Sequence, residues 1–170
     1  MLVRRAGKLE RFAVLAAVGQ RRGLTLGGMV VAQAAQNKAP RLTGRLKRNL
    51  TPGKPFPTGT WSWAVHVGTN VIYAAIHEFG GVIVPRVAKM LAIPIGNLKG
   101  SPRQHNLHIA RTKGGTWLLM DGADQAQYVL KQSVTIPARP YLRPALEEKR
   151  RVVGNVILKS IFGALRGMGK

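Results

Sequence analysis

Both ends of the chain repeat their apolar residues with the 3.6-residue period of an amphipathic helix. From Leu9 onward, apolar side chains recur at i, i+3, i+4 and i+7, and basic residues occupy positions between them. Gly19, Gly23 and Gly27 then follow at four-residue intervals. Each glycine weakens a helix by roughly 1 kcal/mol relative to alanine, so we expect a break here and a second helical piece from Leu26. The alternative is that the glycines let another helix pack closely.

A second long helical pattern covers about 142–166, with an apolar stripe from Leu146 to Ala164. Between the two helical ends, four stretches have the length and apolar content of strands, and the first of them also alternates apolar and polar residues. The expected strands are 60–68, 89–95, 115–120 and 128–136. We therefore expect an α+β fold in which an antiparallel β-sheet packs against long N- and C-terminal helices.

The 170 residues, 45% of them apolar, are enough for one domain with a sizeable core. We expect a single domain that comprises 1–170. It has an N-terminal helical region at about 4–50, a sheet region at about 58–137 and a C-terminal helix at about 142–166. In its middle, the polar stretch 95–114 is expected to form an extended loop or hairpin.

Prolines predict a rigid corner between the last strand and the last helix. Pro137 and Pro140 fix φ at about −65° and disfavour helix in the residue before them. Pro144 differs, because it suits the first helical turn, where its missing N–H is not needed. Tyr141 brings an apolar side chain that can hold the corner against the rest of the fold. The residues with an expected structural role here are Arg139, Pro140, Tyr141, Arg143 and Pro144.

A short buried helix is expected within 71–81, ended by a glycine pair. Its expected core side chains are Ile72, Ala75, Ile76 and Phe79. Glu78 is an isolated acid among these apolar neighbours. Such a carboxylate can be a catalytic base, but more often it holds an arginine or a backbone N–H. We expect Glu78 to be structural and to pair with Arg139 or Arg143.

The chain carries 27 lysine and arginine residues against six acids, a net charge of +21. The ends are the most basic, since 1–50 carries +10, 51–100 carries +3 and 101–170 carries +8. Such an excess attracts phosphates and acidic protein surfaces, although it can also be no more than a solvated surface. Charge alone therefore leaves contact with nucleic acid open.

A basic segment follows Pro40, which ends the first helical region. Leu42, Leu46 and Leu50 share one helical face, and Thr43 can cap the helix. The basic side chains lie on the other faces, where they are either merely hydrated or turned toward DNA or an acidic partner. The candidate DNA-facing or partner-facing residues are Arg41, Arg45, Lys47 and Arg48.

The sequence lacks the motifs of serine hydrolases, nucleotide-binding loops, dinucleotide-binding folds and zinc proteases. It contains no cysteine, which excludes disulfides and thiolate metal sites. His105 and His108 have a spacing that can ligate a metal on a helix, but neither a clear helix nor a nearby acid accompanies them. No apolar run fits a secretory signal or a membrane span. We expect a protein without enzymatic activity, cofactor or metal that assembles in a reducing cytoplasm.

Three segments carry a further signal when they are taken in order. They are Ala39-Pro-Arg-Leu-Thr-Gly-Arg-Leu46, Tyr73-Ala-Ala-Ile-His-Glu-Phe-Gly80 and Ile136-Pro-Ala-Arg-Pro-Tyr-Leu-Arg-Pro-Ala-Leu146. Together they resemble the tail-completion (neck) protein family of long-tailed bacteriophages and prophages. Two positions depart from the family pattern: Gly81 stands where a threonine often follows Glu-Phe-Gly, and Tyr141 replaces the usual phenylalanine.

The resemblance implies a structural virion protein rather than an enzyme, located in the tail or neck and assembled in the host cytoplasm. It implies a homo-oligomeric ring, commonly a hexamer, at the head-proximal end of the tail, where it helps to join the tail to the capsid connector. The implied partners are other copies of the chain, the tail terminator or tail tube, and head-connector or stopper proteins. Packaged DNA is a possible partner without sequence preference, and a membrane is not.

In such a ring, we expect the stretch 95–114 to reach a neighbouring subunit or the next ring. Its candidate inter-subunit residues are Lys99, Arg103, His105, His108 and Arg111. The rival interpretation is a free basic DNA-binding, nucleoid-like protein, whose affinity for DNA would fall steeply with salt. A third and weaker one is a metal-dependent nuclease that uses Glu78, His105 and His108.

Overall fold

The computed structural model describes residues 2–40 and 44–166, with side chains described from Gly7 onward. The chain divides into two compact units. The helical unit contains 1–79 and 138–170, and the sheet unit contains 80–137. Long terminal helices and antiparallel strands between them confirm the α+β class. The single domain expected for 1–170 stays a prediction.

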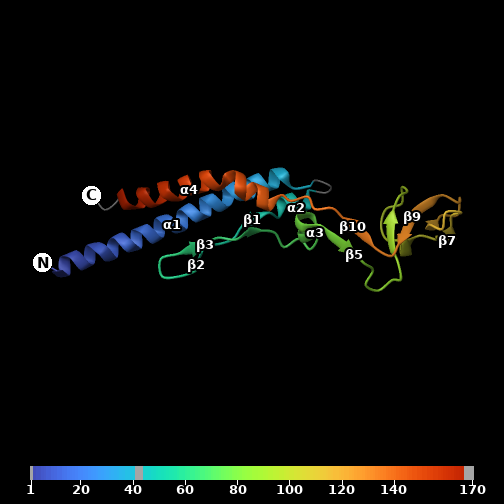
Figure 1. Cartoon of the computed structure of the whole chain (residues 1–170), viewed down its shortest axis with the longest axis horizontal. Helices are drawn as coiled ribbons and strands as arrows, with labels where there is room; N and C mark the ends of the chain where they lie inside the picture. Colours follow the sequence, from blue (N-terminus) through green and yellow to red (C-terminus); the bar gives the residue numbers. More distant parts are fainter. Residues whose placement is uncertain (1, 41–43, 167–170) are drawn as a thin grey trace. The chain divides into compact units, whose positions relative to one another are not determined.

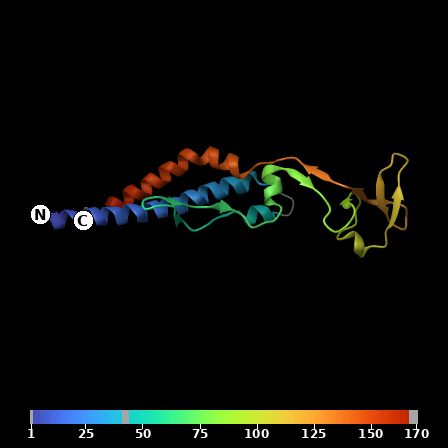
Figure 2. The ribbon, with the colours of Figure 1, turned by 60° about the horizontal axis from the view of Figure 1, so that its bottom comes forward.

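Two long helices form the frame of the helical unit, α1 (Leu2–Lys38) and α4 (Leu142–Arg166). They lie side by side in Figure 1 and in the rotated view of Figure 2. Their closest contacts repeat every four residues and run in opposite directions along the two helices, which shows an antiparallel pair. These contacts join Gly19 to Ile161, Gly23 to Ile157 and Gly27 to Val153.

The predicted break near Gly19 and Gly23 is wrong, because α1 is continuous, and the alternative of close helix packing is confirmed. A Cβ atom on Gly19 would lie 2.6 Å from the Cα of Ile161, and one on Gly23 would lie 2.7 Å from the Cα of Ile157. Any side chain at these positions would therefore push the helices apart. Packing against α4 offsets the intrinsic cost of glycine in a helix.

Short elements complete the helical unit. They are α2 (Arg45–Arg48), β1 (Thr51–Pro52), β2 (Phe56–Pro57), β3 (Trp63–Ala64), β4 (Val67–Gly68) and α3 (Ala74–Phe79). The strands form two antiparallel pairs, β1 with β4 and β2 with β3. Strands β1, β3 and β4 contact α1.

The single strand expected at 60–68 is wrong, because this stretch is divided into β3 and β4. Each strand pairs with a different piece of the proline-rich segment that precedes it. The division falls at His66, whose ring stacks on Phe56 with centroids 4.7 Å apart and whose carbonyl accepts the Gly53 N–H at 2.7 Å. Trp61, one of the apolar residues in the alternation of 60–68, is 70% exposed.

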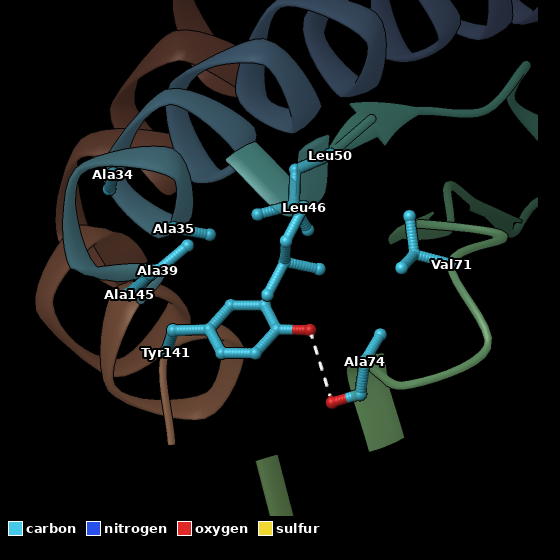
Figure 3. Packing of buried hydrophobic residues seen from close by; sticks show 9 residues of the cluster. All are labelled: Ala34, Ala35, Ala39, Leu46, Leu50, Val71, Ala74, Tyr141 and Ala145. Atoms are coloured by element: carbon cyan, nitrogen blue, oxygen red, sulfur yellow. Dashed lines mark hydrogen bonds between the residues drawn. The ribbon is translucent and has the colours of Figure 1, made fainter. Parts of the chain in front are cut away.

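A cluster of buried side chains joins the C-terminal end of α1 to α2, α3 and the start of α4 (Figure 3). Its members are Ala34, Ala35, Ala39, Leu46, Leu50, Val71, Ala74, Tyr141 and Ala145. Tyr141 and Leu50 are fully buried, and the small side chains around them make room for the tyrosine ring. Burial of Leu46 and Leu50 follows the predicted apolar face. Leu42 and the predicted cap Thr43 lie outside the described residues, and Gly44 precedes α2 without a side-chain cap.

The sheet unit contains a two-stranded ribbon and a four-stranded antiparallel sheet. The ribbon pairs β5 (Gly81–Ile83) with β10 (Val134–Ile136). The larger sheet has the order β6-β9-β8-β7 and consists of β6 (Leu91–Pro94), β9 (Ala126–Lys131), β8 (Trp117–Met120) and β7 (His108–Arg111). A 3₁₀ helix, η1 (Pro102–Gln104), lies between β6 and β7.

Two of the expected strands, 89–95 and 115–120, are present with shorter bounds as β6 and β8. The single strand expected at 128–136 is wrong, because Lys131 ends β9 and Val134 begins β10 in a different sheet. The hairpin alternative for 95–114 is confirmed in its second half, where β7 pairs with β8. Strand β5 was not expected, since a three-residue strand is too short to show a period.

Replacing Gly23 with alanine tests whether the helix contact sets the stability of the helical unit. We expect Gly23→Ala to lower the free energy of unfolding by about 1–3 kcal/mol, because the new methyl group overpacks the contact with Ile157. The matched control is Gly154→Ala in α4, where nothing lies within 4 Å of the added Cβ and helix propensity alone gives a gain of up to about 1 kcal/mol. Denaturant unfolding measures both, and an equal gain in the two variants would contradict the close contact.

Candidate assembly and DNA-facing surfaces

Glu78 connects α3 to the first turn of α4. Its carboxylate accepts the backbone N–H groups of Tyr141 at 2.8 Å and of Leu142 and Arg143 at 3.0 Å each. N–H groups at a helix start have no partner inside the helix. Pro144 follows and has no N–H to satisfy. A carboxylate from a distant segment therefore caps α4 and faces the positive end of its dipole.

The expected pairing of Glu78 with an arginine side chain is wrong, although a structural carboxylate with backbone partners is what the structure shows. The Arg143 side chain is 83% exposed, and its Nε donates to Glu147 at 3.1 Å. The Arg139 backbone N–H donates to the His77 carbonyl at 2.7 Å. The side chains of Arg139 and Arg143 are exposed, and the carboxylate of Glu78 is bonded to backbone N–H groups instead.

Burial by itself raises the pKa of the Glu78 carboxyl group, whose residue is only 7% exposed. The three backbone hydrogen bonds outweigh burial and hold this pKa below its ordinary value. The neighbouring Tyr141 hydroxyl donates to the Ala74 carbonyl at 3.4 Å, the dashed line in Figure 3. Burial, and then the negative charge of Glu78, raise the pKa of Tyr141, so the phenol stays a neutral donor.

The Glu78 cap also fixes which face of α3 is buried. Ala74 and Glu78 are buried, whereas Ile72 is 98% and Phe79 is 80% exposed. Ala75 is exposed too and Ile76 is half-buried, so the expected core face is wrong for Ile72, Ala75 and Phe79. The apolar period predicts which face of α3 is apolar. It carries no information on the N–H groups of α4, which require a carboxylate acceptor. Rotating α3 to satisfy that need leaves Phe79 largely in solvent.

An apolar groove of about 650 Å³ opens in the helical unit beside this cap. Its walls come from α1, β4, α3 and the start of α4. Lining side chains include Leu24, Val31, Val65, Phe79, Leu146 and Val153. Leu146, which was expected in the buried stripe of α4, is 54% exposed, and Ala145 is buried in its place. A groove with exposed large apolar side chains is typical of a surface that contacts another protein.

Further apolar side chains are exposed on the two long helices. Leu9 is 70%, Phe12 is 50% and Val14 is 62% exposed on α1, and Phe162 is 60% exposed on α4. Basic residues accompany them along both helices. No helix among the described residues combines the length and the apolarity that a membrane crossing requires.

The chain has far more lysine and arginine residues than acids, 27 against six. Ion pairs of lysine and arginine in the described part of the chain join Lys38 and Lys149 to Glu148, and Arg143 to Glu147. Hydrogen bonds from Lys149 and Lys38, and then their charges, lower the pKa of Glu148 to about 2. Little acidic charge is left for the other cations.

The structure places three of the four candidate DNA-facing residues on the short helix α2. Arg45 and Arg48 are exposed, and Lys47 is half-buried. Lys47 and Arg48 form no ion pair within the described residues. Arg41 lies outside the described residues. The grouping of these cations on one helix is compatible with a phosphate-facing surface.

The candidate inter-subunit stretch 95–114 is folded along its length. Ser101 and Gln104 form a reciprocal capping box on η1, and the His105 Nε2 lies 2.9 Å from the Lys99 carbonyl oxygen. Arg103 is a residue of η1. The structure therefore brings Lys99, Arg103 and His105 together in one turn.

His108 and Arg111 belong to β7 rather than to this turn. The His108 Nε2 is 3.3 Å from an Asp124 carboxylate oxygen, and the Arg111 guanidinium lies 5.1 Å from the centre of the Trp117 ring. No group of three or more histidine, aspartate or glutamate side chains that could hold a metal ion occurs among residues 2–40 and 44–166.

The sequence interpretation missed two surface features. One is the apolar groove, which forms from segments far apart in the chain and has no local signal. The other is β5 with Val84, an apolar run between a glycine pair and Pro85. Punctuation by glycine and proline on both sides is a strand signal that could have identified it.

Comparison with known proteins adds one finding. The model of the phage virion morphogenesis family matches residues 57–161, more than half of the chain. The match begins in β2 and includes α3, the sheet unit and most of α4. Neither a curated protein nor a solved structure matches the chain.

Replacing Glu78 with alanine tests the cap on α4. We expect a loss of about 2–4 kcal/mol in unfolding free energy, because each charge-assisted bond contributes about 1.5–3 kcal/mol and water replaces part of them. The matched control is Glu147→Ala, which removes an exposed carboxylate one turn further along α4 and should change stability by less than about 1 kcal/mol. Denaturant unfolding measures both variants. Equal effects of the two substitutions would show that the Glu78 cap contributes no more to the free energy of unfolding than an exposed carboxylate does.

The same cap predicts a pH dependence. The folded pKa of Glu78 is below the unfolded value of 4.5, so its stabilisation is fully present above pH 4.5 and is lost as pH falls through the folded pKa. The stability difference between the unchanged protein and Glu78→Gln should therefore shrink as pH falls below 4.5. Unfolding curves of the two proteins between neutral and acidic pH measure it, and a constant difference would exclude the ionised carboxylate as the cap.

Proposed function

Because the chain belongs to the phage virion morphogenesis family, we propose that it is a neck protein: a ring of identical subunits at the head-proximal end of the tail. The ring helps to join the tail to the capsid connector, and its role is structural rather than enzymatic. The family match carries the proposal, because it contains two of the three segments that resemble tail-completion proteins. Those two segments, 73–80 and 136–146, are also the ones that meet in the Glu78 cap.

Exposed apolar surface supports a subunit that functions in contact with others. The groove beside the cap, with Phe79 and Leu146 largely exposed, offers a recess of about 650 Å³. The exposed apolar side chains of α1 offer a second surface. The partners that fit the proposal are further copies, as in a hexamer, together with tail terminator or tube proteins and connector or stopper proteins.

The net charge of +21 supports a place beside packaged DNA or acidic neighbours. DNA of any sequence must pass through a neck, so the attraction has to come from phosphate contacts rather than from base reading. Lys47 and Arg48 are the first candidates, with Arg45 beside them and Arg41 as a candidate from sequence alone. Lys47 and Arg48 form no ion pair among the described residues, which leaves these two side chains available to a partner of opposite charge.

A free nucleoid-like DNA-binding protein remains the second candidate function, and the net charge of +21 is the observation that favours it. It would bind DNA as a monomer or dimer, with affinity that falls steeply with salt. The exposed apolar groove and helix faces favour the neck protein instead, because exposed apolar surface serves contacts with other proteins and phosphate binding does not require it.

Imaging of phage particles tests the proposal. Particles assembled without the chain should accumulate as separate heads and tails, and restoring the chain should restore joined particles with density for it at the head-proximal end of the tail. Joined, infectious particles that lack the protein altogether would refute the neck assignment. Purified protein that stays monomeric and coats DNA would favour the second candidate.

The same experiment has an arm for the turn at 101–106. Its hydrogen bonds are internal apart from the contact of His105 with Lys99, so replacing it by a short glycine linker should leave the fold intact. We expect a folded protein with unchanged melting that joins fewer particles, because this turn reaches a neighbouring subunit or ring. A full yield of joined particles would remove the turn from the proposed contacts.

A further inference from the structure

The β5–β10 ribbon of the sheet unit has two open edges. Its register pairs Ile83 with Val134, Val82 with Thr135 and Gly81 with Ile136. Within the described residues neither strand has a second partner. In an antiparallel pair, every second residue turns its N–H and C=O groups away from the partner strand. Both outer edges therefore present unpaired backbone donors and acceptors to another strand.

Apolar side chains are exposed on the same ribbon. Val82 is 60%, Ile83 is 39% and Val84 is 59% exposed, and Val134 and Ile136 are half-buried. An isolated two-stranded ribbon is marginally stable in water, and further strands or a packed face are needed to stabilise it. The ribbon therefore has the composition of a sheet interior and the exposure of a sheet edge.

The ribbon is also uncharged, in a chain with a net charge of +21. The segments 80–85 and 132–138 contain no lysine, arginine, aspartate or glutamate. Two copies of so basic a chain repel each other over most of their surface, but this repulsion is least where both segments meet. The charge distribution thus favours a second copy as the occupant, since a partner chosen by attraction would be acidic and would gain nothing here.

The four-stranded sheet lacks this combination at its edges. Its edge strand β7 carries His108 and Arg111, and the apolar side chains of its other edge strand β6, Leu91 to Ile93, are half-buried. Pro85 and Pro137, which have no N–H to donate, limit the ribbon edges, so a pairing strand is confined to about three or four residues.

We propose that β5 of one copy pairs with β10 of the next, so that the ribbons of neighbouring subunits form one continuous antiparallel sheet. The two edges are different strands, as a head-to-tail contact requires, and such contacts close into rings when the rotation between subunits allows it. The order β10-β5-β10-β5 keeps every neighbour antiparallel. This contact rests on the proposed ring and names its subunit interface.

The absence of cysteine allows a direct test by site-specific cross-linking. Two tagged versions of the chain, one with Val82→Cys and the other with Thr135→Cys, are mixed during particle assembly and treated with a short bismaleimide. A single cysteine per chain excludes cross-links within one copy. We expect a cross-linked dimer that contains both tags. We expect it to be lost when Val82→Cys is replaced by Ile72→Cys in the helical unit, although Ile72 is 98% exposed and Val82 only 60%.

Each other result overturns the contact. Cross-links only between two Val82→Cys copies would show a back-to-back pairing of β5, and cross-links to a different virion protein would make that protein the occupant. Joined particles that contain the chain in a ring but yield no cross-linked dimer would refute the strand pairing and leave the neck proposal standing. Absence of the chain from the particles would instead refute the neck proposal itself.

Discussion

The hydrogen bonds from three backbone N–H groups to one carboxylate hold the helical unit together at its centre. Glu78 sits on a six-residue helix that could not stay folded alone, and α4 begins with a proline-rich segment that cannot supply its own cap. Each element satisfies the other, because the carboxylate needs donors when buried and the helix start needs an acceptor. The burial of Tyr141, the rotation of α3 and the exposure of Phe79 all follow from this contact.

The C-terminal helix and the proline corner before it could be predicted from sequence because their signals are local. The 3.6-residue period of α4 and the prolines around Tyr141 act within one or two turns of the chain. The segments 73–80 and 136–146, which carry the family resemblance, are in contact in the structure through the hydrogen bonds of Glu78. The apolar pattern by itself predicts helices but carries no signal for the contact between Glu78 and the start of α4.

The wrong predictions share a physical cause, which is a partner distant in sequence. Gly23 reads as a helix breaker until Ile157 is placed against it at a distance that no side chain tolerates. From sequence, Glu78 is expected to pair with an arginine, but in the structure it accepts backbone N–H groups at the start of α4. The stretch 60–68 reads as one strand until β1 and β2 pair with its two halves. In each case the local sequence favours one conformation or partner, and a tertiary contact stabilises a different one.

The register of the helix pair determines which turns of α1 have α4 beside them. Continuing the four-residue steps from Gly19 and Ile161 places Arg166, the last described residue of α4, level with Val14. The turns of α1 before that point, with Leu9 and Phe12 exposed, have no part of the described α4 opposite them. Helix stability in water depends on packing, so we expect the turns of α1 that contact α4 to exchange their amide hydrogens more slowly than the first turns of α1. In the proposed ring, contacts with neighbouring copies would give the exposed side chains Leu9 and Phe12 a packing surface.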